Sequence, residues 1–267
     1  MDLSAGSVFD TSDSSTANNN LIVIDDGRLT VIAATSLPGV PSTATLRGPH
    51  LQLNAETEAN INSGTLILEN GLTADATSTI NIGTNAGLQI DDVSTIDGDL
   101  NITGTGASLV VNADLEINDA VFDWDGGEDA VTTVNEGGHL TIVADDVTPG
   151  VSDDTFDGTI NLSGGDLTVA IVPGWTLAGT LNFAGGQFFN SLGLLTIEGN
   201  VNVTGGSSLL VVDSVFASGS NTTIQGTSDV LDTKKDTRIE AGAVFSGKGL
   251  FETNGNSSLT LADGAGV

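Results

Sequence analysis

One phrase recurs along this chain at a nearly constant interval, and it constrains the fold more than any other feature. The phrase is an apolar residue, Asn, an apolar residue, a small residue and two glycines, at 160–165, 181–186 and 201–206. These copies start 21 and 20 residues apart, and looser copies start at 80, 100, 122, 140 and 222. A fixed period near twenty residues indicates a repeat architecture in which each repeat is one structural unit.

Each phrase predicts a short β-strand that ends in a tight turn. Successive residues of a strand point to opposite sides, so Leu181 and Phe183 are expected in the core, and Asn182 outside it. Val201 and Val203 should likewise be buried, with Asn202 outside. The glycines that follow permit the positive φ angles of tight turns. Apolar residues recur at i and i+2 and not at helical spacing, which excludes a helical repeat.

Two further apolar runs follow each phrase, so three short strands fit into one repeat. Examples are 167–169 and 175–177, and Trp175 in the second of these is expected in the core or in end-of-coil packing. The sequence therefore predicts an all-β fold, a single right-handed parallel β-helix (β-solenoid) with about 20 residues per coil. A β-sandwich is the alternative architecture, although it does not explain the constant spacing.

The domain organisation follows from where the rhythm becomes regular. We expect residues 1–50 to form less regular N-terminal coils or a cap, and residues 51–267 to form the regular β-helix. Within the first part, residues 21–24 and 29–32 flank Asp25-Asp26-Gly27. They form either a hairpin with an Asp-Gly turn or two successive sides of a first coil.

The charge excludes several classes of partner. The chain has 35 acidic and 6 basic residues, with a formal net charge of −29. Nucleic acid is excluded because its binding requires Lys and Arg, and docking on an anionic membrane is disfavoured for the same reason. Cysteine is absent, which excludes disulfides and thiolate metal sites. The apolar runs are too short for a transmembrane helix, so we expect no direct membrane insertion.

Several repeats resemble those of a known group of proteins. The repeats at 179–183 and 195–203 resemble the passenger repeats of bacterial autotransporters and related large surface adhesins, and the resemblance covers about residues 51–267. It implies a segment of a longer exported protein, secreted or held at the cell surface, with a structural or adhesive role. The partners implied are glycans, a host or neighbouring cell surface, or other copies of the same protein.

One set of polar residues is a candidate binding surface. The middle, outward position of the phrase is occupied by Asn81, Asn101, Asn161, Asn182 and Asn202. Stacked coils would place these side chains in one row, about 4.8 Å apart. Such a row forms either a ladder of side chains that hydrogen-bond to one another or a flat polar face for a glycan, ice or a mineral.

A second candidate is a calcium site, and calcium is the only cofactor that the sequence suggests. Four carboxylates lie close together in a glycine-containing stretch: Asp123, Asp125, Glu128 and Asp129. Oxygen ligands on a flexible loop suit Ca²⁺. The stretch is not an EF-hand loop, because it lacks Gly at the sixth place and Glu at the twelfth. The alternative interpretation is a solvated acidic surface.

A non-enzymatic structural or adhesive role is the function that the sequence favours. One alternative is a carbohydrate-active β-helix, a polysaccharide lyase or hydrolase, whose formal candidates are the pairs at 91–92, 145–146 and 153–154. His50 and His139 lie far apart in the repeat order and carry no catalytic phrase. The other alternative is a cation-dependent scaffold module that assembles with copies of itself through its end coils.

Overall fold

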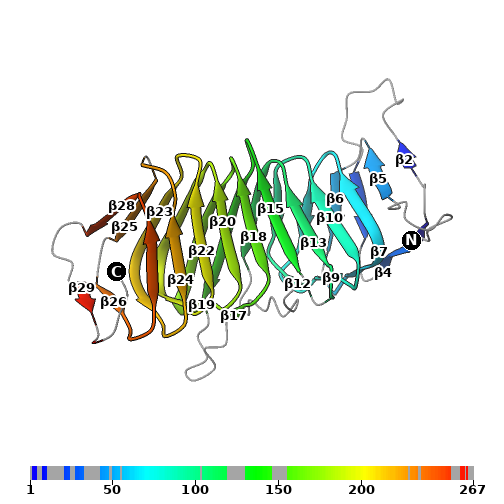
Figure 1. Cartoon of the computed structure of the whole chain (residues 1–267). Coiled ribbons are helices and arrows are strands. Elements are labelled where there is room, and N and C mark those ends of the chain that lie inside the picture. The colour runs from blue at the N-terminus through cyan, green and yellow to red at the C-terminus, as the bar shows by residue number, and fades with distance from the viewer. Residues whose placement is uncertain are drawn as a thin grey trace.

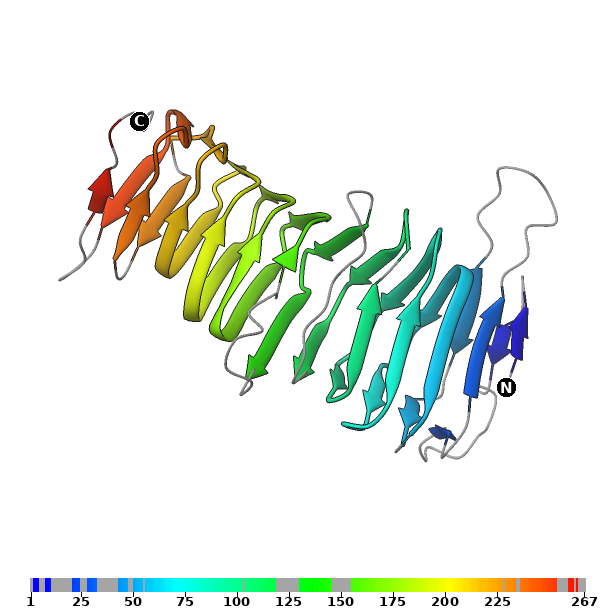
Figure 2. The same cartoon turned by 90° about the horizontal axis from the view of Figure 1, so that it is seen from below.

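The protein is a three-sided rod of stacked parallel strands, as the computed structural model shows (Figures 1 and 2). The structure describes residues 2–4, 8–10, 21–24, 28–32, 43–47, 50–54, 56–102, 104–118, 130–145, 155–227, 229–233, 236–253, 259–261 and 263. Within these ranges there is no helix, and the strands stack as a β-solenoid with about 21 residues per turn. The predicted fold class is therefore confirmed, whereas the right-handed sense stays a prediction.

We call the three sides of the rod face 1, face 2 and face 3. Each turn of the chain passes through face 2, then face 3 and then face 1. Face 1 contains β2 (Val8–Asp10), β5 (Thr43–Arg47), the second part of β7 (Glu58–Leu68), β10 (Ala86–Ile90), β13 (Ser108–Val111), β15 (Val131–Asn135), β18 (Thr159–Ser163), β20 (Thr180–Ala184), β22 (Asn200–Thr204), β24 (Asn221–Ile224) and β27 (Val244–Gly247). Figure 1 shows these strands side by side along the rod.

The other two faces are built in the same way. Face 2 contains β3 (Leu21–Ile24), β6 (His50–Leu53), β8 (Leu72–Ala74), β11 (Ser94–Ile96), β14 (Asp114–Asn118), β16 (His139–Asp145), the first parts of β19 (Asp166–Leu177), β21 (Gln187–Ile197) and β23 (Ser208–Phe216), β25 (Val230–Thr233) and β28 (Leu250–Thr253). Face 3 contains β1 (Asp2–Ser4), β4 (Arg28–Ile32), the first part of β7, β9 (Thr79–Ile82) and β12 (Asp99–Ile102), and later β17 (Thr155–Phe156), the second parts of β19, β21 and β23, β26 (Thr237–Ile239) and β29 (Leu259–Leu261).

The pairing of the first strands decides between the two interpretations of the N-terminal region. β3 pairs in parallel with β6, and β4 pairs in parallel with β7. They are two sides of one coil and not a hairpin, because each strand bonds to its equivalent in the next turn. The division of the chain at residue 50 stays a prediction.

The core is a continuous apolar column inside the three faces. Leu181, Val201 and Val203 are fully buried, and Phe183 is 1% exposed, whereas Asn182 and Asn202 are only partly buried. The predicted inside and outside positions of these residues are confirmed. Trp175 is buried as predicted, and its ring meets the edge of Phe188 at a centroid distance of 6.1 Å.

Asn190 is a buried polar residue of this core that sequence reasoning missed. Asn190 is fully buried on β21, next to a bulge where the pairing register with β23 shifts. Its Oδ1 accepts a hydrogen bond from Nε1 of Trp175 at 2.9 Å, and its Nδ2 donates to the carbonyl of Gly193 at 3.3 Å. Gly193 has φ of 73°, which lets one continuous strand turn the corner from face 2 to face 3.

A core hydroxyl gives a first testable prediction. Thr222 faces inward in register with Val201, and its Oγ1 is buried without a hydrogen-bond partner in the described part of the chain. Replacing Thr222 with Val keeps the shape and removes the unsatisfied hydroxyl, so the free energy of unfolding should rise by about 1 kcal/mol. Urea titration measures this change. Thr223→Val, at an outward position, is the control and should change stability little. Loss of stability in Thr222→Val would contradict the interpretation.

Candidate binding face

The Asn residues proposed as one row lie in two rows on different faces. Asn81 and Asn101 are paired on β9 and β12 of face 3, whereas Asn161, Asn182 and Asn202 are paired on β18, β20 and β22 of face 1. The prediction of a single row is therefore wrong. All sides of the solenoid share the same apolar–polar alternation. Because the coils that run from β13 to β18 are longer than their neighbours, the phrase moved to another side without altering its appearance.

Within each row, the prediction of a hydrogen-bonded ladder is confirmed. On face 1, Nδ2 of Asn182 donates to Oδ1 of Asn161 at 3.0 Å, and Nδ2 of Asn202 donates to Oδ1 of Asn182 at 2.9 Å. On face 3, Asn101 donates to Asn81 at 3.0 Å, and Asn81 donates to Asn60 at 2.9 Å. An amide inside a ladder uses one of its two N–H groups and one of its two lone pairs for this purpose.

A further ladder lies at the end of the face 1 strands. Nδ2 of Asn112 donates to Oδ1 of Asp91 at 2.6 Å, and Nδ2 of Asn135 donates to Oδ1 of Asn112 at 2.7 Å. Sequence reasoning missed this row, although Asp91, Asn112 and Asn135 follow one another at the coil period. Asp91 is thus part of a structural ladder, which speaks against its proposed catalytic pairing with Asp92.

The most distinctive surface is the central part of face 1, which we call the neutral face. Within β13, β15, β18, β20, β22 and β24, the outward side chains carry no charge: Ser108, Val110, Val131, Thr133, Asn135, Thr159, Asn161, Ser163, Thr180, Asn182, Ala184, Asn200, Asn202, Thr204, Asn221 and Thr223. Neighbouring strands lie about 4.8 Å apart, so amides and hydroxyls repeat at that interval along the rod.

Carboxylates lie instead on the other faces and the turns. Described examples are Asp99 on face 3, Asp114, Glu116 and Asp166 on face 2, and Glu198 in the turn before β22. With a net charge of −29, the molecule surrounds an uncharged strip with a negative field. This arrangement favours uncharged ligands on the neutral face and repels anionic ones.

The described ranges contain no candidate metal site. There is no group of three or more His, Asp or Glu side chains that would hold a metal ion among the residues described. The predicted calcium ligands Asp123, Asp125, Glu128 and Asp129 lie outside them, as do Asp146, Asp153 and Asp154. That site stays a prediction.

Both histidines and the buried carboxylate of Asp229 have structural contacts. Nε2 of His50 forms a hydrogen bond with Oγ1 of Thr73 at 2.8 Å, and Nε2 of His139 forms one with Oγ1 of Thr168 at 3.1 Å. Asp229 is fully buried, and its carboxylate accepts hydrogen bonds from three backbone N–H groups, two of them from Gly206 and Gly226 at 2.7 and 2.6 Å. These contacts tie neighbouring turns together.

Comparisons with known proteins do not assign this chain to a family. They gave no matching family model, no matching curated sequence and no matching solved structure. Within the described part of the chain, no helix has the length and apolar character needed to cross a membrane. The likeness to adhesin repeats therefore stays a resemblance.

Proposed function

We propose that this protein is a non-enzymatic β-solenoid of an exported or cell-surface bacterial protein, and that it adheres to uncharged glycans through its neutral face. The observation that carries this proposal is the run of uncharged outward side chains, most of them Thr, Asn or Ser, from β13 to β24. A flat face with a regular spacing suits a long repetitive ligand better than a small molecule.

The chemistry of the neutral face selects the class of glycan. Sugar hydroxyl groups both donate and accept hydrogen bonds, as do the amide and hydroxyl groups of this face. Each laddered Asn keeps a fixed orientation through its neighbour, as in the 2.9 Å bond from Asn202 to Asn182, so little side-chain entropy is lost on binding. The surrounding carboxylates repel anionic polysaccharides, which leaves uncharged ones as the favoured ligands.

Affinity on such a face comes from repetition. The outward positions of these six strands hold no aromatic ring that would stack on a sugar, so each sugar unit binds weakly. A polymer that contacts several strands at once gains from multivalency, because the later contacts are intramolecular. We therefore expect binding to long polymers and little binding to short oligosaccharides.

The test is binding to insoluble polysaccharides of different charge. The purified protein should sediment with uncharged polymers such as cellulose or chitin and should leave anionic polymers such as pectate in the supernatant. Thr159→Glu with Thr180→Glu places two charges on adjacent strands of the neutral face. The apparent affinity of this double variant should fall by more than about tenfold.

A matched control exists on face 3. Thr176 and Thr196 are also outward, partly buried and paired on adjacent strands, so changing both to Glu alters the net charge by the same amount. This control should bind like the unmodified protein. An equal loss in both double variants, or stronger binding to anionic polymers, would contradict the proposal.

A further inference from the structure

Half of the exposed large apolar side chains in the described ranges lie at one corner of the rod. This corner joins face 2 to face 3, where β16, β19 and β21 are neighbours in the sheet. The outward positions of the neutral face are mostly Thr, Asn and Ser, so a cluster of large apolar side chains departs from that pattern. We call this cluster the corner patch, and its members are 37–53% exposed: Val143, Val172, Phe189, Leu192 and Leu194.

The pairing of the strands makes the corner patch continuous. Val143 is in register with Ala170, and Ala170 with Leu192, so three outward residues form a row across three neighbouring strands. Adjacent strands lie about 4.8 Å apart, which makes this row about 10 Å wide along the rod. The patch extends along β21 from Phe189 to Leu194, over at most about 17 Å. A continuous exposed apolar surface of this kind marks an interaction site.

Bulges form this corner and fix the backbone beneath the patch. At the register shift, β19 has three residues, 171–173, where β21 has Gly193 alone. Oγ of Ser191 donates to the carbonyl of Val169 at 3.2 Å, and Nδ2 of the buried Asn190 donates to the carbonyl of Gly193 at 3.3 Å. Because these bonds hold the strands in place, a partner meets a preformed surface and binding costs little ordering of the chain.

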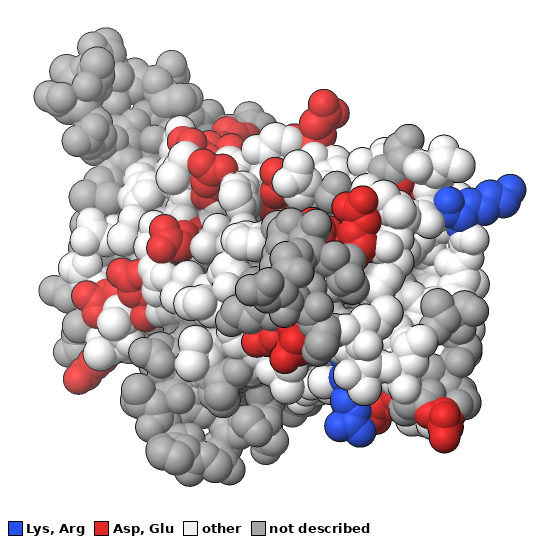
Figure 3. Space-filling view, turned by 90° about the vertical axis from the view of Figure 1, so that its left-hand side faces the viewer, with Lys and Arg blue, Asp and Glu red and all other residues white. Residues whose placement is uncertain are grey.

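The charge around the corner patch selects the partner. Positions 48–233 contain 26 Asp and Glu residues and no Lys or Arg. Asp213 is the register partner of Leu194, and Asp166 lies outward at the start of β19. Arg238, on β26 two strands beyond the patch, already pairs with a carboxylate at 3.3 Å. Figure 3 shows acidic side chains spread over one view of the rod and basic ones at its margin. This field attracts a cationic partner and repels an anionic membrane or a second copy of the chain.

We propose that the corner patch binds a cationic amphipathic helix, a short segment with apolar side chains on one side and Lys or Arg on the other. A helix is about 10 Å in diameter and three of its turns measure about 16 Å, which matches the size of the patch. The apolar stripe of the helix would cover the patch, and its cations would lie over Asp213 and the outward carboxylates of face 2. This site is independent of glycan binding, which uses face 1.

A designed peptide tests the chemistry of the partner. The probe is a fluorescent peptide of about 15 residues, made of Leu and Lys with the leucines at helical spacing. Its fluorescence anisotropy should rise when the protein is added at physiological ionic strength. A peptide of the same composition in scrambled order has the same charge and no apolar stripe, so it should bind at least about tenfold more weakly. Equal binding of the two peptides would mean that charge alone attracts them and would refute the proposal.

Matched pairs of leucine substitutions locate the peptide on the protein. Leu192→Thr with Leu194→Thr removes two apolar side chains from the corner patch, keeps the charge, and suits a strand. This double variant should bind the helical peptide more than about tenfold more weakly than the unmodified protein. Leu250→Thr with Leu261→Thr is the control, because these leucines are 46% and 52% exposed, against 53% and 42% in the patch. The control should bind the peptide like the unmodified protein.

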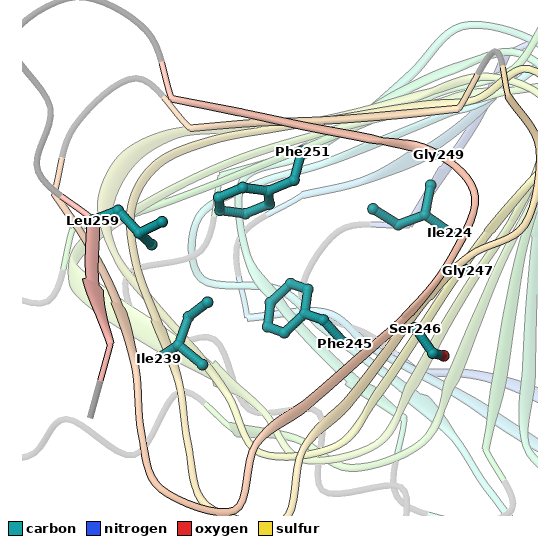
Figure 4. A pocket seen from close by; sticks show the side chains of 8 residues that line it. All are labelled: Ile224, Ile239, Phe245, Ser246, Gly247, Gly249, Phe251 and Leu259. Carbon is teal, nitrogen blue, oxygen red and sulfur yellow. The ribbon is translucent and has the colours of Figure 1, made fainter. Parts of the chain in front are cut away.

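The control also tests a competing apolar site. A cavity of about 210 Å³ lies beside β28 and β29, the strands that carry Leu250 and Leu261. Its apolar lining side chains point into the space between the three faces (Figure 4): Ile224, Ile239, Phe245, Phe251 and Leu259. A loss of binding in the control as large as that in the patch variant would place the peptide at this cavity and overturn the proposal.

Sedimentation velocity distinguishes the peptide from a second copy as the occupant of the patch. We expect no self-association that depends on the corner patch, because two such acidic surfaces repel each other. Dimers that disappear in Leu192→Thr with Leu194→Thr would make a second copy the occupant and refute the proposal. Thr159→Glu with Thr180→Glu should bind the peptide at least as tightly as the unmodified protein. Weaker binding in this variant would place the peptide on the neutral face and would equally refute it.

Discussion

Replacing Leu181 with Asp should lower the free energy of unfolding by about 4 kcal/mol or more, the largest loss expected from a single substitution in this chain. Leu181 is fully buried and lies between Ile160 and Val201 on the adjacent strands of face 1. A carboxylate at this position would be sealed inside the apolar column without a partner. Urea titration followed by circular dichroism measures the effect.

The neighbouring residue provides the control. Asn182→Asp keeps the shape of the side chain, but it replaces the Nδ2 donor with a carboxylate oxygen that faces the acceptor Oδ1 of Asn161. Because this position is only partly buried, a loss of about 1–2 kcal/mol is expected. The ratio between the two losses tests the inward and outward assignment directly. Similar losses from Leu181→Asp and Asn182→Asp would mean that the register of β20 is wrong.

The second large effect concerns a column of glycines at the corner between faces 3 and 1. A Cβ atom on Gly199 would lie 1.8 Å from the carbonyl oxygen of Gly179 and 2.3 Å from that of Ala178. The carbonyl of Gly179 accepts a hydrogen bond from the N–H of Asn200, so the two turns cannot separate freely. Gly199→Ala should therefore destabilise the protein by about 3 kcal/mol.

Gly206, at the next corner of the same coil, shows the cost of backbone strain without the cost of crowding. Gly206 has φ of 82°, and a Cβ there would meet nothing within 4 Å. Gly206→Ala should cost only the strain of a left-handed backbone, about 1 kcal/mol. Thermal unfolding of both variants compares the destabilisation caused by crowding with that caused by backbone strain. A larger loss from Gly206→Ala than from Gly199→Ala would show that the turns are not stacked as closely as described.

The fold could be predicted from the sequence because every coil repeats the same alternation of apolar and polar residues. Alternation placed Leu181 and Phe183 inside, and the recurrence of the phrase required equivalent strands to stack. This alternation did not reveal which side of the rod each apolar–Asn–apolar strand occupies, because Asn101 and Asn161 have nearly identical neighbouring residues. Only the number of residues per coil distinguishes the sides, and that number is larger in the coils between β13 and β18 than in their neighbours.

The candidate site was only partly predictable for a related reason. The ladder position of Asn182 follows from the repeat, whereas the neutrality of a whole face depends on knowing which strands are neighbours. Asn190 was missed because its hydrogen bond to Trp175 depends on a bulge.

The equivalence of β18, β20 and β22 has a consequence for how such a chain changes in evolution. Ile160, Leu181 and Val201 occupy the same place in successive turns, and each turn touches only the turns beside it. In-frame duplication or loss of one turn of coding sequence would join residues of matching position and leave the rest of the ladder intact. Each such event would change the reach of the rod by about 4.8 Å while its surface pattern is inherited unchanged.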